Sequence, residues 1–139
     1  MGGQGWRVPE SVERGGNRGY VSALVVGEVA FKLLFAKASE LGVKLFWEFR
    51  RKLAGDRAFR RECFRPVLEF SRYLDGLSGL AWVHVTGEDC EEGLEIALRH
   101  GLLTADAIHV AVALRLGVPI ATFDEDFKEV PGLAVVGLA

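Results

Sequence analysis

Residues 101–127, GLLTADAIHVAVALRLGVPIATFDEDF, place a helix pattern directly before a strand pattern. Thr104 is a suitable N-cap, and the Ala- and Val-rich run from Ala105 to Leu116 predicts a helix packed on a sheet. Gly117 and Pro119 mark the end of this helix, and VPIATF after it predicts a strand. A helix that leads directly into a strand is typical of a parallel sheet with helical crossovers.

The same alternation continues along the rest of the chain. Short strands are expected at 19–21, at 80–86 and within LAVVG near the end. Helices are expected over 23–41, 44–53, 57–74 and 87–101. Pro66 would kink or divide the third of these helices, and Gly42 suits a left-handed cap. We therefore predict an α/β fold of three layers, with a central parallel sheet flanked by helices.

Length and composition predict a single domain. The chain has 139 residues, and residues 1–19 hold six glycines and a proline. This N-terminal segment is expected to be irregular, which leaves a domain over 20–139. The two cysteines, Cys63 and Cys90, form no C-x-x-C pair, so a zinc knuckle or disulfide framework is not expected. No apolar run approaches the length of a membrane span and no signal peptide is evident, so we expect a cytoplasmic protein.

Three acidic residues stand in places where a carboxylate needs an explanation. Glu28 lies on the same helix face as Leu24, Val25 and Phe31, where a buried charge is costly unless it is paired or metal-bound. It could instead point to a solvated edge. Asp106 lies in the first turn of its helix, where an acid also offsets the helix dipole.

The third acid, Asp124, follows the strand PIATF, and Asp126 comes two residues later. Ligands bind at the carboxyl ends of strands in open parallel sheets, although Asp124 could simply cap a short helix. If Glu28, Asp106 and Asp124 meet at one sheet edge, their mutual repulsion favours a bound divalent cation. An oxygen-only ligand set prefers Mg²⁺ or Mn²⁺, which suits metal-assisted hydrolysis of phosphodiesters.

A basic stretch runs from Arg50 to Arg72, with eight basic residues against three acidic ones. The net charge of the whole chain is −2, so this positive region is local. It could be an ordinary solvated helix face, or it could contact a phosphate backbone. The residues that could contact such a backbone are Arg50, Arg51, Arg57, Arg60 and Arg61.

These motifs resemble those of the PIN domain, in particular the small VapC-type toxin ribonucleases of toxin–antitoxin pairs. The resemblance rests on YVSALVVGEVAFKLL, on the segment over 101–127 and on PGLAVV. It implies an endoribonuclease that binds Mg²⁺ or Mn²⁺ through Glu28, Asp106 and Asp124. It also implies a further acid at Asp126 and a supporting hydroxyl at Thr122. Ser22 is the expected N-cap of the helix that carries Glu28 and is included as a second supporting residue. RNA as substrate, a protein antitoxin and a homodimer are further implications of the resemblance.

One part of the family pattern is missing from the sequence. PIN domains begin with a central strand that ends in an aspartate, whereas residues 1–27 of this chain contain no Asp. Asp75 follows Glu28 in the chain and ends a predicted helix, so it does not replace that aspartate. The chain therefore resembles a PIN domain without its first strand. The alternative function is accordingly an inactive or weakly active PIN-like protein that acts through protein–protein interaction.

Overall fold

The computed structural model describes residues 18–122, 130–133 and 135–137. Within these residues, helices and parallel strand pairs form an α/β fold, as the sequence predicts. The elements in chain order are β1 (Gly19–Val21), α2 (Ala23–Glu40), α3 (Phe46–Gly55), α4 (Arg57–Asp75), β2 (Leu80–Trp82), α5 (Gly87–His100), α6 (Thr104–Leu116), β3 (Ile120–Thr122) and β4 (Val135–Gly137).

The described residues divide into two compact units. The first unit holds β1, β2, α3, α4 and the part of α2 from Val25 onward. The second unit holds α5, α6, β3 and β4, together with residues 22–24. The prediction of a single domain over 20–139 is not tested by this division and stays a prediction.

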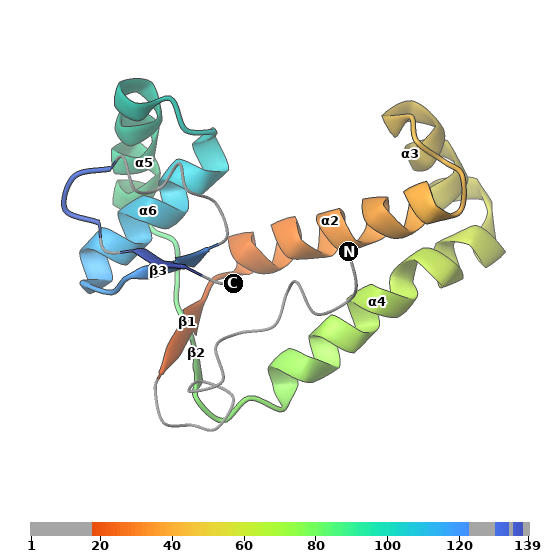
Figure 1. Cartoon of the computed structure of the whole chain (residues 1–139), viewed down its shortest axis with the longest axis horizontal. Helices are drawn as coiled ribbons and strands as arrows, with labels where there is room; N and C mark the ends of the chain where they lie inside the picture. The colour runs from red at the N-terminus through yellow and green to blue at the C-terminus, as the bar shows by residue number, and fades with distance from the viewer. Residues whose placement is uncertain (1–17, 123–129, 134, 138–139) are drawn as a thin grey trace. The chain divides into compact units, whose positions relative to one another are not determined.

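In the first unit, β1 and β2 pair in parallel, with Tyr20 opposite Ala81. Figure 1 shows α2 leaving this strand pair, α3 at its far end, and α4 returning toward β2. An aromatic cluster fills the α2–α3–α4 end, where the ring centroids of Phe35 and Phe49 are 5.2 Å apart. Asp56 caps α4 by accepting a hydrogen bond of 3.0 Å from the Phe59 amide.

In the second unit, α5 and α6 pack closely, and β3 pairs in parallel with β4. The close approach depends on Gly93, because a Cβ there would lie 2.7 Å from the Ile108 Cα. The core of the unit includes Ile96, Val110 and Ala111, with Ile120 of β3 packed against it. Short apolar residues on α6 therefore bring a helix and a strand pair together around one small core.

The predicted helices are confirmed, and so are the left-handed glycines Gly42 and Gly117, while three details are corrected and one open alternative, at Pro66, is decided. Thr104 is not the N-cap of α6: the cap is Leu103, which makes no side-chain hydrogen bond, and Thr104 is the first helical residue. The predicted strand at 80–86 is confirmed only over Leu80–Trp82. The helix expected at 44–53 begins two residues later. Pro66 does not divide α4, which is one helix throughout.

Candidate active site

Asp106 is positioned by the start of α6. It lies in the first turn of this helix and its side chain is half-buried. Gly117 ends α6 in the left-handed conformation, with φ of 69°, and the chain turns back into β3. The carboxyl end of β3, at Thr122, therefore points toward the end of α6 that carries Asp106.

Asp124 and Asp126 lie outside the described residues, and so does the side chain of Thr122. In the sequence, Asp124 follows the last residue of β3 by two positions. The roles of these residues stay predictions, as do those of the other site residues.

Glu28 lies in the N-terminal half of α2 and is half-buried. Val26, Val29 and Leu33 carry the packing of α2 in this part of the first unit. Glu28 and Asp106 belong to different units, and each is placed only within its own unit. Ser22, the predicted N-cap of α2, is 3% exposed and belongs to the second unit, like Asp106.

The donor set of the proposed site fits a hard divalent cation. Its groups are carboxylates and hydroxyls, the oxygen ligands that Mg²⁺ and Mn²⁺ prefer. Within the described residues no group of three or more His, Cys, Asp or Glu side chains is arranged to hold a metal. Two of the four predicted ligands, Asp124 and Asp126, are not among those residues.

The sequence did not predict the role of one further acid, the buried Asp89. It is 3% exposed in the first turn of α5, where it forms a capping box with Thr86. The Nε of Arg115 donates to one Asp89 carboxylate oxygen and Nη2 donates to the other, both at 2.9 Å. The hydrogen bonds from Arg115 lower the pKa of Asp89 to about 2. Asp89 is thus a structural anion that ties α5 to α6.

The capping box could have been predicted from the T-x-x-D pattern over Thr86–Asp89. The ion pair between Asp89 and Arg115 could not have been predicted, because the two residues are 26 positions apart in the sequence. Arg115 also donates to the carbonyl oxygen of His84 at 2.9 Å. β2 itself stops at Trp82 because its partner strand β1 ends opposite it, at Val21.

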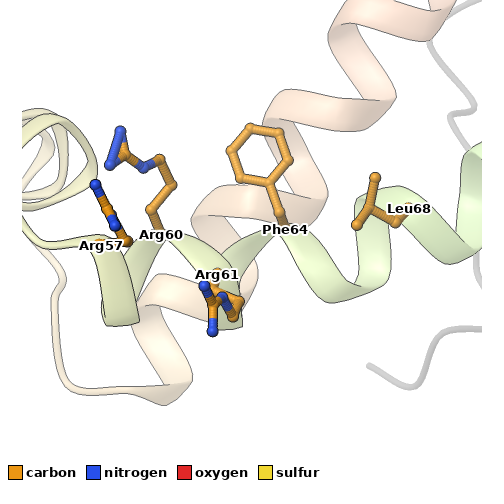
Figure 2. A pocket seen from close by; sticks show the side chains of 5 residues that line it. All are labelled: Arg57, Arg60, Arg61, Phe64 and Leu68. Carbon is orange, nitrogen blue, oxygen red and sulfur yellow. The ribbon is translucent and has the colours of Figure 1, made fainter.

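The predicted basic residues lie on two helices of the first unit. Arg50 and Arg51 are exposed on α3, and the Arg51 Cζ lies 5.0 Å from the centroid of the Trp47 ring. The other three basic residues, Arg57, Arg60 and Arg61, lie on α4. They line a shallow groove of about 350 Å³ together with Phe64 and Leu68 (Figure 2).

Comparison with known families decides how this arrangement is classified. The model of the PIN domain family matches residues 7–133, which is most of the chain. The chain belongs to the PIN domain family. PIN domains are in general nucleases that use divalent metal ions, so the family assignment supports a hydrolytic enzyme with a metal site. Comparison with curated proteins finds no match.

The matched PIN region includes Glu28, Asp106 and Asp124. In the part of the chain that the structure describes, no single helix is long and apolar enough to cross a membrane.

Proposed function

We propose that this PIN-domain protein is a Mg²⁺- or Mn²⁺-dependent endoribonuclease, the toxin of a VapC-type toxin–antitoxin pair. It hydrolyses phosphodiester bonds of RNA in the cytoplasm. The observation that carries the proposal is the family match over residues 7–133, within which three acids occupy the positions that the resemblance assigns to PIN ligands. The start of α6 supports it further, because Asp106 and the carboxyl end of β3 belong to one end of the second unit.

In this mechanism the carboxylates of Glu28, Asp106 and Asp124 would hold the ion, and Asp126 would add a fourth acidic group. The chemistry supplied by a bound divalent ion is a lowered pKa of water and neutralisation of the scissile phosphate. Ser22 and Thr122 are the supporting hydroxyls of the proposed site.

Arg50 and Arg51 are the proposed RNA contacts on α3. Both guanidinium groups are exposed, and Trp47 beside Arg51 is 58% exposed, so a phosphate and a base could be bound side by side. Arg57, Arg60 and Arg61, which were also expected to contact RNA, border an apolar groove. We keep these three arginines as proposed RNA contacts on α4.

The proposal includes two protein partners. A toxin of this type is paired with an antitoxin, which would neutralise the acidic site with a basic residue. It would also form a homodimer. Both partners follow from the VapC-type resemblance.

The decisive variant for the function is Asp124→Asn, assayed on single-stranded RNA in Mg²⁺ and in Mn²⁺. We expect cleavage to fall by about 100-fold or more, because a neutral amide holds a divalent cation much less well than a carboxylate. Asp75→Asn is the matched control, since Asp75 is an exposed acid at the end of α4. Equal cleavage by Asp124→Asn and the parent chain would show that the assigned site is wrong.

A second function is favoured by one observation, the absence of any Asp from residues 1–27. The chain would then be a PIN-fold protein that binds a partner without cleaving RNA. Calorimetry with Mn²⁺ separates the two functions. The nuclease predicts saturable Mn²⁺ binding that Asp124→Asn abolishes, whereas the interaction protein predicts no such binding and a stable complex with its partner.

A further inference from the structure

Three large aromatic side chains of the first unit are about half exposed. Phe31 of α2 is 45% exposed, and Phe46 and Trp47 of α3 are 53% and 58% exposed. Single exposed apolar residues are common, but neighbouring ones that form a patch indicate an interaction surface. We call these three residues the aromatic track. Glu28 and the track belong to the same compact unit, so their relation does not depend on where the second unit lies.

The track joins α2 to α3 through direct contact between two rings. The centroids of Phe31 and Phe46 are 6.1 Å apart, and the rings meet edge to face. The Phe31 ring also contacts the Phe35 ring at 6.0 Å and the buried Phe49 ring at 6.2 Å. A ring that its neighbours already hold in place loses little rotamer freedom when a ligand stacks on it. Phe31 therefore offers an exposed aromatic surface that is already ordered.

Phe31 lies next to a proposed metal ligand. It follows Glu28 by three positions in α2. Side chains three residues apart in a helix are neighbours on one face, with Cβ atoms about 5–6 Å apart. A group that binds to Phe31 therefore lies one helical turn from the carboxylate that the nuclease proposal assigns to the metal.

Arginines accompany the track on α3. Arg50 follows Phe46 by four positions and Arg51 follows Trp47 by four, so each ring has an exposed guanidinium group one turn further along the helix. The Arg51 Cζ lies 5.0 Å from the Trp47 ring centroid. The acid of this helix, Glu48, is half-buried and lies about 160° around the helix from Phe46. Rings that stack on bases, beside cations that pair with phosphates, are typical of sites for single-stranded nucleic acid.

We infer that the aromatic track binds unpaired bases of the RNA substrate, with the base next to the scissile phosphate on Phe31 and neighbouring bases on Phe46 and Trp47. The inference deepens the proposed function and rests on it, because RNA as substrate and Glu28 as a metal ligand belong to that proposal. Bases within a duplex are stacked on one another, so only single-stranded RNA can occupy the track. The arginine beside each α3 ring favours RNA over a protein partner as the occupant.

The test measures the affinity of the full chain for a fluorescein-labelled single-stranded RNA of about ten nucleotides. Fluorescence anisotropy is recorded in EDTA, where the proposed nuclease does not cleave. Phe31→Leu and Phe46→Leu keep an apolar side chain but remove the ring. Each should raise the dissociation constant by about fivefold, and both together by about 20-fold, because each change removes one base stack. Phe31→Tyr and Phe46→Tyr keep the ring and should bind RNA like the parent.

An abasic RNA separates stacking from every other effect of these substitutions. It has the same length and the same phosphates as the first RNA, but it lacks the bases. The parent chain should bind the abasic RNA less tightly than the complete RNA, and this comparison needs no variant. The double leucine variant should distinguish the two RNAs by a much smaller factor, since two of the three rings are gone.

Two controls exclude simpler explanations. Leu98→Ala removes an exposed apolar side chain in the second unit, where Leu98 is 88% exposed on α5, and should leave RNA affinity unchanged. Urea unfolding of the leucine variants should give midpoints close to that of the parent, because leucine still packs against Phe35 and Phe49.

Three results would overturn the inference. The first is equal RNA affinity of the parent and the leucine variants. The second is a parent chain that binds abasic and complete RNA equally well. The third is unchanged RNA affinity accompanied by lost binding of a protein partner in the leucine variants, which would assign the track to that partner.

The outcome is distinguishable from that of the nuclease proposal. Cleavage by Asp124→Asn at the parent rate would remove the assigned metal site, and the binding measured in EDTA would still report on the track. Unchanged affinity of the leucine variants would remove the track, and the loss of cleavage in Asp124→Asn would still support the nuclease.

Discussion

The helices α5 and α6 both carry an aspartate in their first turn, but the two aspartates have different surroundings. Asp89 of α5 accepts hydrogen bonds from the Thr86 amide and from Arg115, so both of its carboxylate oxygens serve the fold. Asp106 of α6 follows a cap, Leu103, that makes no side-chain hydrogen bond, and it is only half-buried. An acid at a helix start is therefore not a functional signal by itself. For Asp89, the hydrogen bonds and the ion pair with Arg115 identify an acid that serves the fold.

Asp106→Asn should have the largest effect, and it tests the contrast between Asp106 and Asp89. RNA cleavage in Mg²⁺ should fall by about 100-fold or more, because a proposed ligand loses its charge. The free energy of unfolding should change by only about 0.5 kcal/mol, as expected for loss of an acid from the helix dipole. Single-turnover cleavage and urea unfolding measure the two quantities. A large loss of stability with unchanged cleavage would make Asp106 a structural acid like Asp89.

The next largest effect should come from Gly93→Ala, which separates the two helices that carry these acids. The added Cβ would lie 2.7 Å from the Cα of Ile108, and backbone cannot move aside cheaply. We expect a loss of about 3 kcal/mol in the free energy of unfolding, the upper part of the range for overpacking. Thermal and urea unfolding provide the measurement. Gly87→Ala is the matched control, because nothing lies within 4 Å of a Cβ at that position.

Asp89→Asn should mainly reduce stability. The amide keeps the shape of the side chain but loses the charge that binds Arg115, which removes about 2 kcal/mol of charged hydrogen bonding. The folded fraction should still cleave RNA at the parent rate when assayed below its melting temperature. Loss of cleavage in the fully folded variant would contradict the separation between Asp89 and Asp106.

The pH dependence of unfolding tests the same ion pair. Asp89 has a pKa of about 2 in the folded chain against an ordinary value of 3.8, so the folded state binds fewer protons between these values. Its contribution to stability is complete above about pH 4 and is lost as the pH falls toward about 2. Asp89→Asn should remove this part of the acid destabilisation. A variant with the same pH profile as the parent would exclude Asp89 as its source.

The smallest effect is expected from Thr86→Ala, which removes half of the capping box. The Asp89 amide loses its acceptor, a hydrogen bond of 3.1 Å to the Thr86 hydroxyl. A lost N-cap typically costs about 1 kcal/mol, so urea unfolding should show a modest shift of the midpoint. Thr104→Ala is the comparison, since Thr104 is not the cap of α6 and should change stability less. The reverse order of the two variants would contradict the cap assignments.

The helices were predictable from the sequence because their ends are set by local chemistry. Gly42 and Gly117 have positive φ, as their positions after apolar helical runs predicted. The Asp56 cap marks the break between α3 and α4 within a few residues. Thr104 was predicted wrongly because a cap residue and a first-turn residue share the same preference for small polar side chains.

The end of β2 and the role of Asp89 depend on contacts between residues that are far apart in the sequence, and a single sequence does not show such contacts. The strand predicted at 80–86 ends at Trp82, and the His84 carbonyl accepts a hydrogen bond from Arg115 on another helix. Asp106 and Asp124 were chosen by their positions at the ends of elements, and Glu28 by its place on an apolar helix face. Asp106 does lie at the start of α6, as predicted. Asp89 also lies at a helix start, but its role was not predicted, because its partner Arg115 is 26 residues away.

The most direct test of the account is single-turnover cleavage of a labelled single-stranded RNA by the parent chain, Asp106→Asn and Asp89→Asn, each with Mg²⁺ and with EDTA. The account predicts cleavage by the parent and by folded Asp89→Asn in Mg²⁺, about 100-fold less by Asp106→Asn, and none in EDTA. Cleavage by Asp106→Asn at the parent rate, or cleavage by the parent that persists in EDTA, would contradict the central claim that Asp106 belongs to a metal-dependent nuclease site.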